Sequence, residues 1–329
     1  MRRYLLPGLF TALALGYPLL AAGSPVYQRL GALVLLAAIG ASAWNLVGGY
    51  AGQVSVGHAV FFGAGAYAAI AGYTHFGLPP IAGAPVGALV AVLIAALIGV
   101  PTLRLSGHYF SMATIAVAEL VRVLVTNWEW AGGAQGISGP AVPRTFLDLS
   151  FTSAVPYYYL FLAVLAAVLF LTWRIERSRM GYYLRAIKDS ERAARSLGVA
   201  AGRYKLYAYM LSAGLTAVAG SLYALMFGFI DPESGFGILI SVKMLIMAAL
   251  GGAGLLFGPL VGALILVPLE EISNSLLGGR GAGLTFVVYG AIIVVIARFL
   301  PSGLLALLKS LAATPAQRKP AEAGERHAA

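Results

Sequence analysis

Few of the side chains in this sequence that could do chemistry lie inside its long apolar runs. Glu119 and Arg122 are two of them, three residues apart within the run Tyr109–Thr126. Side chains at this spacing share one face of a helix and can form an ion pair. The pair would either fix the rotation of that helix near one end of the run or line a path for a zwitterionic substrate, because an ionisable residue in a membrane segment is a functional candidate.

Lys243 and His58 are the other candidates inside apolar runs. Lys243 stands one or two turns into its run, where a long side chain can extend to the membrane surface or line a pathway. His58 stands near the start of a glycine-rich run. We expect it to pack and form hydrogen bonds rather than to carry protons, because no second histidine or carboxylate lies close to it in the sequence.

The sequence shows no sign of a catalytic or metal centre. It contains no cysteine, which excludes disulfides, thiolate metal ligands and a cysteine nucleophile. No glycine is followed directly by lysine, so the GxxxxGK[ST] phosphate loop is absent. We therefore expect no catalytic residue, no metal site and no cofactor bound by this chain, and any ATP-driven step would need a separate ATPase chain.

The elements that must position these residues are membrane helices. Of the 329 residues, 60% are hydrophobic and only 10% are charged, and the mean hydropathy is +0.86. A soluble domain carries about 25% charged residues. Apolar runs near the ~20 residues that span a bilayer recur along the whole sequence, and abundant glycine suits close helix packing in lipid. The composition predicts an all-α polytopic membrane protein in a lipid bilayer.

Nine apolar runs are candidate membrane segments. The run Ile238–Leu269 would make a helix of about 48 Å, far longer than the ~30 Å hydrocarbon core. Gly251 to Gly254 interrupt it, so we expect two short helices that either both cross or form a re-entrant pair, which gives about ten segments. The first run resembles a signal peptide, but we expect it to be retained as a helix. The runs are Tyr4–Ala22, Leu30–Val47, Val54–Gly72, Ala84–Leu103, Tyr109–Thr126, Val155–Trp173, Leu206–Phe229, Ile238–Leu269 and Leu284–Leu300.

The placement of lysine and arginine predicts the orientation. With the N-terminus inside, 17 basic residues fall on the cytoplasmic side, nine of them between Arg174 and Lys205, and only three fall outside. The positive-inside rule therefore predicts that both termini are cytoplasmic. This distribution accounts for the net charge of +10 without a nucleic-acid partner. We expect a transmembrane domain over residues 1–311 with a cytoplasmic loop at 174–205, and a disordered tail over 312–329.

The cytoplasmic loop contains a predicted helix of about two turns. Asp189 or Ser190 can cap it, Glu191 is favourable in its first turn, and Gly198 can end it. Such a short helix is marginal alone in water, so it must pack either on anionic lipid headgroups or in a groove of a partner. One face would present Ala193, Ala194 and Leu197, and the other Arg192, Arg195 and Ser196.

Two glycine-rich stretches, 48–65 and 251–262, fall at segments that bound the cytoplasmic side. Irregular backbone at membrane depth is tolerated where it is buried in protein or lines a cavity. Gly52, Gly251 and Gly252 would then be flexible points that respond to movement of a partner, or they would simply allow close helix packing.

Four blocks of the sequence resemble one family. Three of them are Gly52–Tyr67, the run from Tyr109 through Gly139, and Gly251–Gly262. The fourth is the loop, through Gly181, Leu184, Arg185, Ala186, Ile187, Asp189, Glu191, Ala193, Ala194, Leu197 and Gly198. Taken in their order along the chain, and covering roughly Asn45 to Leu269, the four blocks resemble LivM-type permeases of branched-chain amino acid ABC importers.

The resemblance implies an ABC-importer permease fold in the bacterial inner membrane that imports branched-chain or related amino acids. It also implies a second, LivH-like permease, two ABC ATPase subunits that use ATP and magnesium, and an extracytoplasmic substrate-binding protein. The loop helix would be the coupling helix that contacts an ATPase. Glu191, Ala193, Ala194 and Gly198 are similar to the EAA…G motif of importers, but the spacing is one residue longer and Arg192 follows the glutamate, which leaves the register of the contact open.

Other functions require features that the sequence shows weakly or lacks. Permeases of the same family serve urea, short amides and small carboxylates, and no residue discriminates among these substrates. An ion-coupled secondary transporter would need several carboxylates at the midplane, where Glu119 is the only candidate. A membrane enzyme would need paired acids or clustered histidines within the spans, and none is visible.

Overall fold

The computed structural model describes residues 14–105, 107–139 and 151–276, together with positions 290, 291, 294, 298 and 303–307. The predicted tail, 312–329, lies outside the described residues. The start of the first predicted span and most of the last one lie outside them as well.

Six helical segments in the described part of the chain are long and apolar enough to cross a membrane. They confirm a helical membrane protein, whereas the count of about ten segments and the side of the termini stay predictions. The helices that form them are α2 (Pro25–Asn45, continued by the π-helical η1, Leu46–Tyr50), α4 (Pro80–Thr102), α5 (His108–Thr126), α6 (Ala154–Glu176), α9 (Ala201–Phe227), and α10 (Pro232–Phe236) with α11 (Ile238–Gly251).

The remaining elements include two long helices, α3 (Ala59–Phe76) and α12 (Gly258–Leu276). The short elements are η2 (Glu129–Ala131), η3 (Gly133–Gln135), β1 (Ile137–Ser138), α7 (Arg179–Asp189), α8 (Glu191–Ser196) and β2 (Phe229–Ile230).

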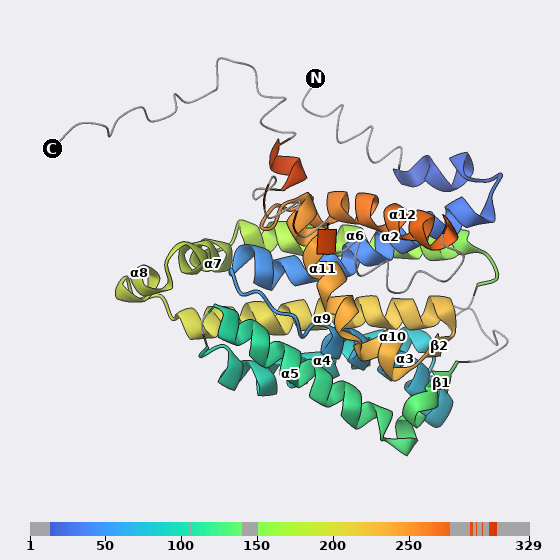
Figure 1. Ribbon diagram of the computed structural model, residues 1–329, viewed down its shortest axis with the longest axis horizontal. Coiled ribbons are helices and arrows are strands. Elements are labelled where there is room, and N and C mark those ends of the chain that lie inside the picture. Colours follow the sequence, from blue (N-terminus) through green and yellow to red (C-terminus); the bar gives the residue numbers. More distant parts are fainter. Residues whose placement is uncertain are drawn as a thin grey trace, which may run out of the picture.

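The helices α2 and α9 form the centre of the fold. Helix α9 packs against α2, α3 and α4, whereas α2 also packs against α6, α11 and α12 (Figure 1). Small residues allow these contacts, because a Cβ on Gly65 would overlap the carbonyl oxygen of Ala217, and a Cβ on Gly220 would overlap that of Phe62. The backbones of α3 and α9 therefore touch directly, which is the packing that glycine permits in lipid.

The two ends of the fold differ in charge and structure. One end carries α7 and α8, and we call it the basic end. Lys205, in the first turns of α9, donates to the carbonyl oxygen of Leu103 at the end of α4. At the opposite end, Ile137 of β1 pairs with Ile230 of β2, so the segments after α5 and α9 meet there (Figure 1).

The structure corrects the start of the span predicted at Val54–Gly72. Helix α3 begins only at Ala59, and residues 51–58 form an irregular segment between η1 and α3. Two of its backbone groups bond to side chains of α5: Ser111 donates to the Val54 carbonyl at 2.6 Å, and the Val56 amide donates to Thr114 at 3.1 Å. Within this segment Ser55, Gly57 and His58 are buried, whereas Gly52 and Val54 are exposed, and non-helical backbone that is buried in protein is tolerated at membrane depth.

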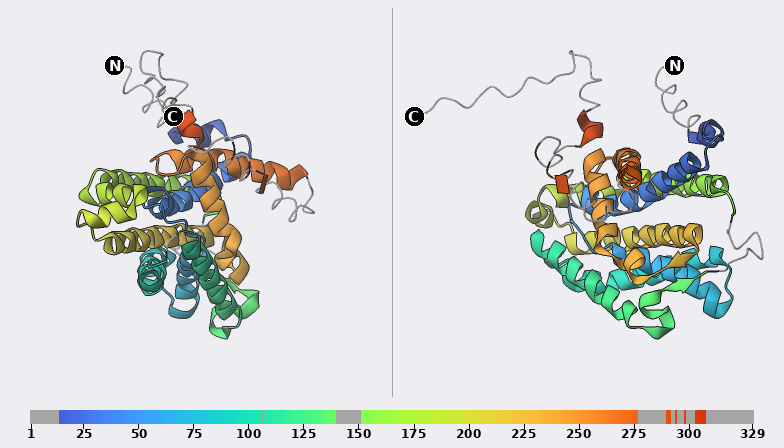
Figure 2. Two further views of the ribbon diagram at one scale, coloured as in Figure 1. Left: turned by 60° about the vertical axis from the view of Figure 1, so that its left-hand side comes forward. Right: turned by 45° about the vertical axis from the view of Figure 1, so that its right-hand side comes forward.

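The long run Ile238–Leu269 forms two helices, as predicted. Helix α11 ends at Gly251, and α12 begins at Gly258 and packs against it. Gly252 and Gly254 have φ of +124° and +85°, backbone angles that residues other than glycine rarely adopt. Helix α11 runs steeply across the direction of α2 and α9 in every view (Figures 1 and 2).

Candidate functional site

The basic end carries two short helices rather than the single one predicted. Helix α7 ends at Asp189, and α8 covers only Glu191–Ser196. Ser190 lies between them in extended conformation, and its Oγ accepts the Ala193 amide at 3.3 Å. Asp189 therefore ends α7 and Ser190 caps α8. The sequence predicts the cap and the stop of α8. It does not predict α7, because the residues before Asp189 enter only through the family resemblance.

The structure also corrects the predicted face of α8. Ala194 is buried against Ile187 of α7 and Ala201 of α9, so it anchors the helix internally. Leu197 is 86% exposed, and Ala193 is exposed as well. Gly198 adopts φ of +84°, as expected for a left-handed stop. A partner can therefore contact Ala193 and Leu197, but not Ala194.

Glu191 fixes α8 to the transmembrane part. Its carboxylate accepts from Lys205 at 3.1 Å and from Arg195 at 2.6 Å. Burial alone raises the pKa of Glu191, but the hydrogen bonds and charges of Lys205 and Arg195 outweigh it and lower that pKa. Because the Lys205 side chain is buried and also donates to Leu103, the three groups tie α8, α9 and the end of α4 together.

Helix α7 is fixed to the end of α6. A Cβ on Gly181 would overlap the carbonyl oxygens of Ile175 and Glu176, so only glycine fits there. Arg185 forms an ion pair with Glu176, the last residue of α6, and the Tyr50 hydroxyl donates to the same carboxylate at 3.4 Å. Gly181 and Arg185 therefore act inside the chain, where they position the loop.

The two glycine-rich stretches meet beside α7. A Cβ on Gly251 would overlap the carbonyl oxygen of Gly258, so this position requires glycine for packing. Gly52 has φ of +68°, and a Cβ there would lie 3.0 Å from Cγ of Lys188. In the sequence Lys188 is one of the nine basic residues of the loop, and no pattern there places it against Gly52. Gly252 lies in the turn after α11.

His58 lies fully buried where α3 begins. Its Nε2 lies 2.9 Å from Oγ of Ser212, and its Nδ1 lies 3.0 Å from Oγ of Ser55. Because Ser212 donates its own hydrogen to Ala43, it accepts from Nε2, and Nδ1 accepts from Ser55. Both ring nitrogens are thus satisfied in a neutral histidine, which supports the predicted hydrogen-bonding role.

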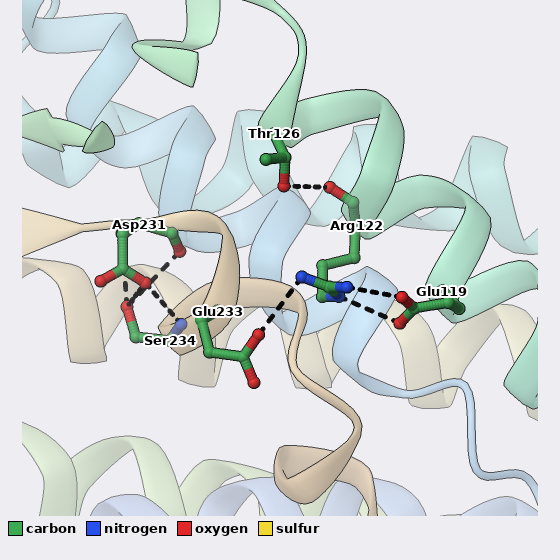
Figure 3. Close-up of polar contacts among 6 residues, drawn as sticks. All are labelled: Glu119, Arg122, Thr126, Asp231, Glu233 and Ser234. Carbon is green, nitrogen blue, oxygen red and sulfur yellow. Dashed lines mark hydrogen bonds and ion pairs between the residues drawn. The ribbon is translucent and has the colours of Figure 1, made fainter. Parts of the chain in front are cut away.

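The predicted pair of Glu119 and Arg122 forms near the opposite end. Arg122 contacts Glu119 at 2.5 Å and also Glu233 of α10 at 3.4 Å (Figure 3). In this close-up the guanidinium lies between the two carboxylates, while Asp231 caps α10 through Ser234. Sequence reasoning missed Glu233 as a partner, because nothing in the sequence places α10 beside α5.

Lys243 lies on α11 and forms an ion pair with Glu270 of α12 at 2.5 Å. Its side chain is therefore held between two packed helices. Across the described residues, no group of three histidine, cysteine or acidic side chains could hold a metal ion.

Comparisons with known proteins give the family. Residues 28–297 match the family model described as "Branched-chain amino acid transport system / permease component". The permease protein LivM of Escherichia coli (strain K12), from a high-affinity branched-chain amino acid transport system, is 31% identical over 288 residues, 80% of this chain and 66% of LivM. This chain thus spans just under two thirds of that relative's length.

Two further curated relatives match with lower identity. LivH of Escherichia coli (strain K12), a permease protein of the same kind of system, is 27% identical over 84% of this chain and 92% of LivH. The autoinducer 2 import system permease protein LsrC of Enterobacter sp. (strain 638) is 29% identical over 57% of this chain and 55% of LsrC.

Among solved structures, a chain of PsaBC from Streptococcus pneumoniae, in complex with Fab, aligns with a TM-score of 0.43 and 18% identity over 86% of this chain and 94% of that chain. The family match alone covers most of the described helices. This chain belongs to the branched-chain amino acid transport system permease family.

Proposed function

We propose that this chain is the membrane-spanning permease subunit of an ATP-driven ABC importer that moves branched-chain or related amino acids into the cytoplasm. It would work in the bacterial inner membrane with a second, LivH-like permease, two ABC ATPase subunits and an extracytoplasmic substrate-binding protein. The chain itself would bind no cofactor, since ATP and magnesium would be used by the ATPase subunits.

The observation that carries the proposal is the surface of α8. This helix projects from the basic end (Figure 1), is anchored from within by Ala194 and Glu191, and exposes 86% of Leu197. An apolar side chain held in water at the tip of a rigid helix is typical of helix-in-groove recognition. The anionic surface of a lipid bilayer is the weaker alternative, because a single leucine provides little apolar area for insertion.

The substrate path is proposed along α5. Glu119 is about 54% exposed on its side chain and lies seven residues, roughly 10 Å, from the last residue of α5. An exposed carboxylate at this depth faces protein or a water-filled cavity rather than lipid. We place the second permease or the translocation path against this face, and Arg122 and Glu233 would then present both charges to a zwitterion.

A second class of substrate is supported by the LsrC match, since LsrC is described as an import permease for autoinducer 2. Urea, amides and small carboxylates are further candidates within the family. An ion-coupled secondary transporter remains the other class, which would show uptake without any ATPase.

The test is reconstitution of the complex. The chain is expressed with candidate partners (a LivH-like permease, ABC ATPases and a binding protein from the same organism), and uptake of labelled leucine, urea and autoinducer 2 is measured in proteoliposomes with and without internal ATP. ATP-dependent uptake of an amino acid is the expected result. Uptake that needs no ATPase, or failure of any ATPase to co-purify with the chain, would refute the proposed function.

A further inference from the structure

Lys188, near the end of α7, extends from the loop to the end of another helix. Its Nζ donates to the carbonyl oxygen of Gly49 at 2.7 Å. Gly49 lies in η1, at the end of the continuous α2–η1 helix. The last carbonyls of a helix have no partner within it, and a cation is favourable at this negative end of the helix dipole. Lys188 therefore caps α2–η1 from a different element.

The same end of α2–η1 is joined to the turn between α11 and α12. Oδ1 of Asn45 accepts the Gly254 amide at 2.8 Å, and its Nδ2 donates to the Leu255 carbonyl at 3.1 Å. A Cβ on Gly49 would overlap the backbone nitrogen of Gly254, so the two backbones touch. Lys188 itself lies against this contact, because a Cβ on Gly254 would be 3.3 Å from its Nζ.

Helix α7 is thus held along its whole length. Gly181 and Arg185 tie its first half to the end of α6, and the Leu184 side chain is fully buried in the core. Lys188 ties its last turn to α2–η1. By contrast, α8 rests on α7 and α9 through Ala194 and Glu191 and exposes its tip. A force applied at α8 therefore reaches the transmembrane helices by two routes, directly through Glu191 and Lys205 to α9, and through α7 to α6 and α2–η1.

We propose that Lys188 is a positioning residue that transmits movement of α7 to the end of α2 and, through Asn45, to the α11–α12 turn. This inference rests on the proposed function, since a partner ATPase bound at α8 would supply the movement. In this proposal the hydrogen bond from Lys188 to Gly49 persists while α7 and α2–η1 move together. Lys188 therefore acts as a strut, meaning a fixed link between the two helices, and not as a contact that breaks during transport.

The first test compares three variants in the reconstituted complex. Lys188→Met removes the charge and the donor, Lys188→Arg keeps both, and Arg203→Met removes an exposed cation from the first turn of α9. The readout is substrate taken up per ATP hydrolysed. Lys188→Met is expected to lower this ratio about tenfold with ATPase binding retained, within the range of typical coupling between two sites. Lys188→Arg and Arg203→Met are expected to keep the ratio near that of the unmodified chain.

A second test replaces the strut by a covalent bond. A Cβ on Gly52 would lie 3.5 Å from Cβ of Lys188, which fits a disulfide, and the chain has no cysteine of its own to interfere. In the variant Gly52→Cys/Lys188→Cys, the reduced form should transport like Lys188→Met, and oxidation should restore the uptake per ATP. The single variants, treated in the same way, control for the strain of a side chain at Gly52.

The outcomes separate the inference from the proposed function. If the unmodified complex shows no ATP-driven uptake, the proposed function fails, whereas disulfide formation can still be measured in the isolated chain. If the disulfide does not form there, the contact is wrong. Equal uptake per ATP in the oxidised and reduced double variant, or a decrease on oxidation, would overturn the strut. The proposed role of Lys188 would also be overturned if uptake and ATP hydrolysis of the Lys188→Met variant both fell in proportion to the amount of folded protein.

Discussion

Truncation of Leu197 to alanine is the most direct test of the docking surface. The Leu197 side chain is 86% exposed in the isolated chain, so the substitution removes almost no packing within it. Surface substitutions of this kind usually change the free energy of unfolding by less than about 0.5 kcal/mol. We therefore expect an unchanged unfolding temperature for Leu197→Ala.

The effect on ATPase binding should be much larger. Burying a leucine side chain completely is worth roughly 1.5–3 kcal/mol, and alanine retains part of this contact. A loss of about 1–2 kcal/mol in the free energy of association corresponds to a Kd raised roughly 5- to 30-fold. The measurement is a titration of labelled ATPase subunits against the permease complex in nanodiscs.

Leu97→Ala is the matched control. Leu97 is 78% exposed but lies within α4, far along the chain from α8, on a helix that is long and apolar enough to cross a membrane. Its substitution should leave the Kd unchanged. An ATPase Kd within twofold of the unmodified chain for Leu197→Ala, or an equal loss for both variants, would refute docking through α8.

Three further predictions concern the positions that hold the site together. Ala194→Leu should overpack the buried contact of α8, lower stability by about 1–3 kcal/mol and expose the loop to proteolysis; an unchanged unfolding temperature would contradict the assigned burial. The lowered pKa of Glu191 means that its pairing with Lys205 stabilises the fold at neutral pH and that this stabilisation is lost as the pH falls through the folded-state pKa, below the ordinary value of 4.5; Glu191→Gln should remove this part of the pH dependence of the unfolding temperature, and an identical profile would contradict it. Gly251→Ala should prevent α11 from packing on α12, because the added Cβ would overlap a carbonyl oxygen of α12. Gly202→Ala, which has open space around it, should fold normally. Equal yields of folded protein for the two variants would contradict the packing role of Gly251.

Much of the fold could be predicted from composition and charge. The apolar runs located the helices α4, α5, α6 and α9 to within about five residues, since length and hydropathy decide a membrane span. The glycines after α11 predicted that the longest run would break into two helices, because positive φ interrupts a helix. The nine basic residues of the loop marked the end at which α7 and α8 lie.

Contacts between distant segments could not be predicted in the same way. The run Val54–Gly72 reads as one apolar span, but the Val54 carbonyl accepts from Ser111 and the Val56 amide donates to Thr114, which compensates for the missing helix there. Ala194 was assigned to an exposed face from helical spacing alone, because nothing in the sequence shows that α7 lies on that side. Asn45 and Lys188 are single polar residues without a motif, and only the approach of their partners gives them a role.

The irregular segment 51–58 also constrains the order in which the protein can fold into the membrane. The Val54 carbonyl and the Val56 amide find partners on α5, and the first amide of α3 donates to Ser241 of α11 at 2.7 Å. These helices are synthesised later than the segment that they satisfy. Unpaired backbone is costly in hydrocarbon, so the region between η1 and α3 can reach its final depth only after α5 and α11 have entered the bilayer. Insertion of this chain is therefore not a simple sequence of helices released one by one from the N-terminus.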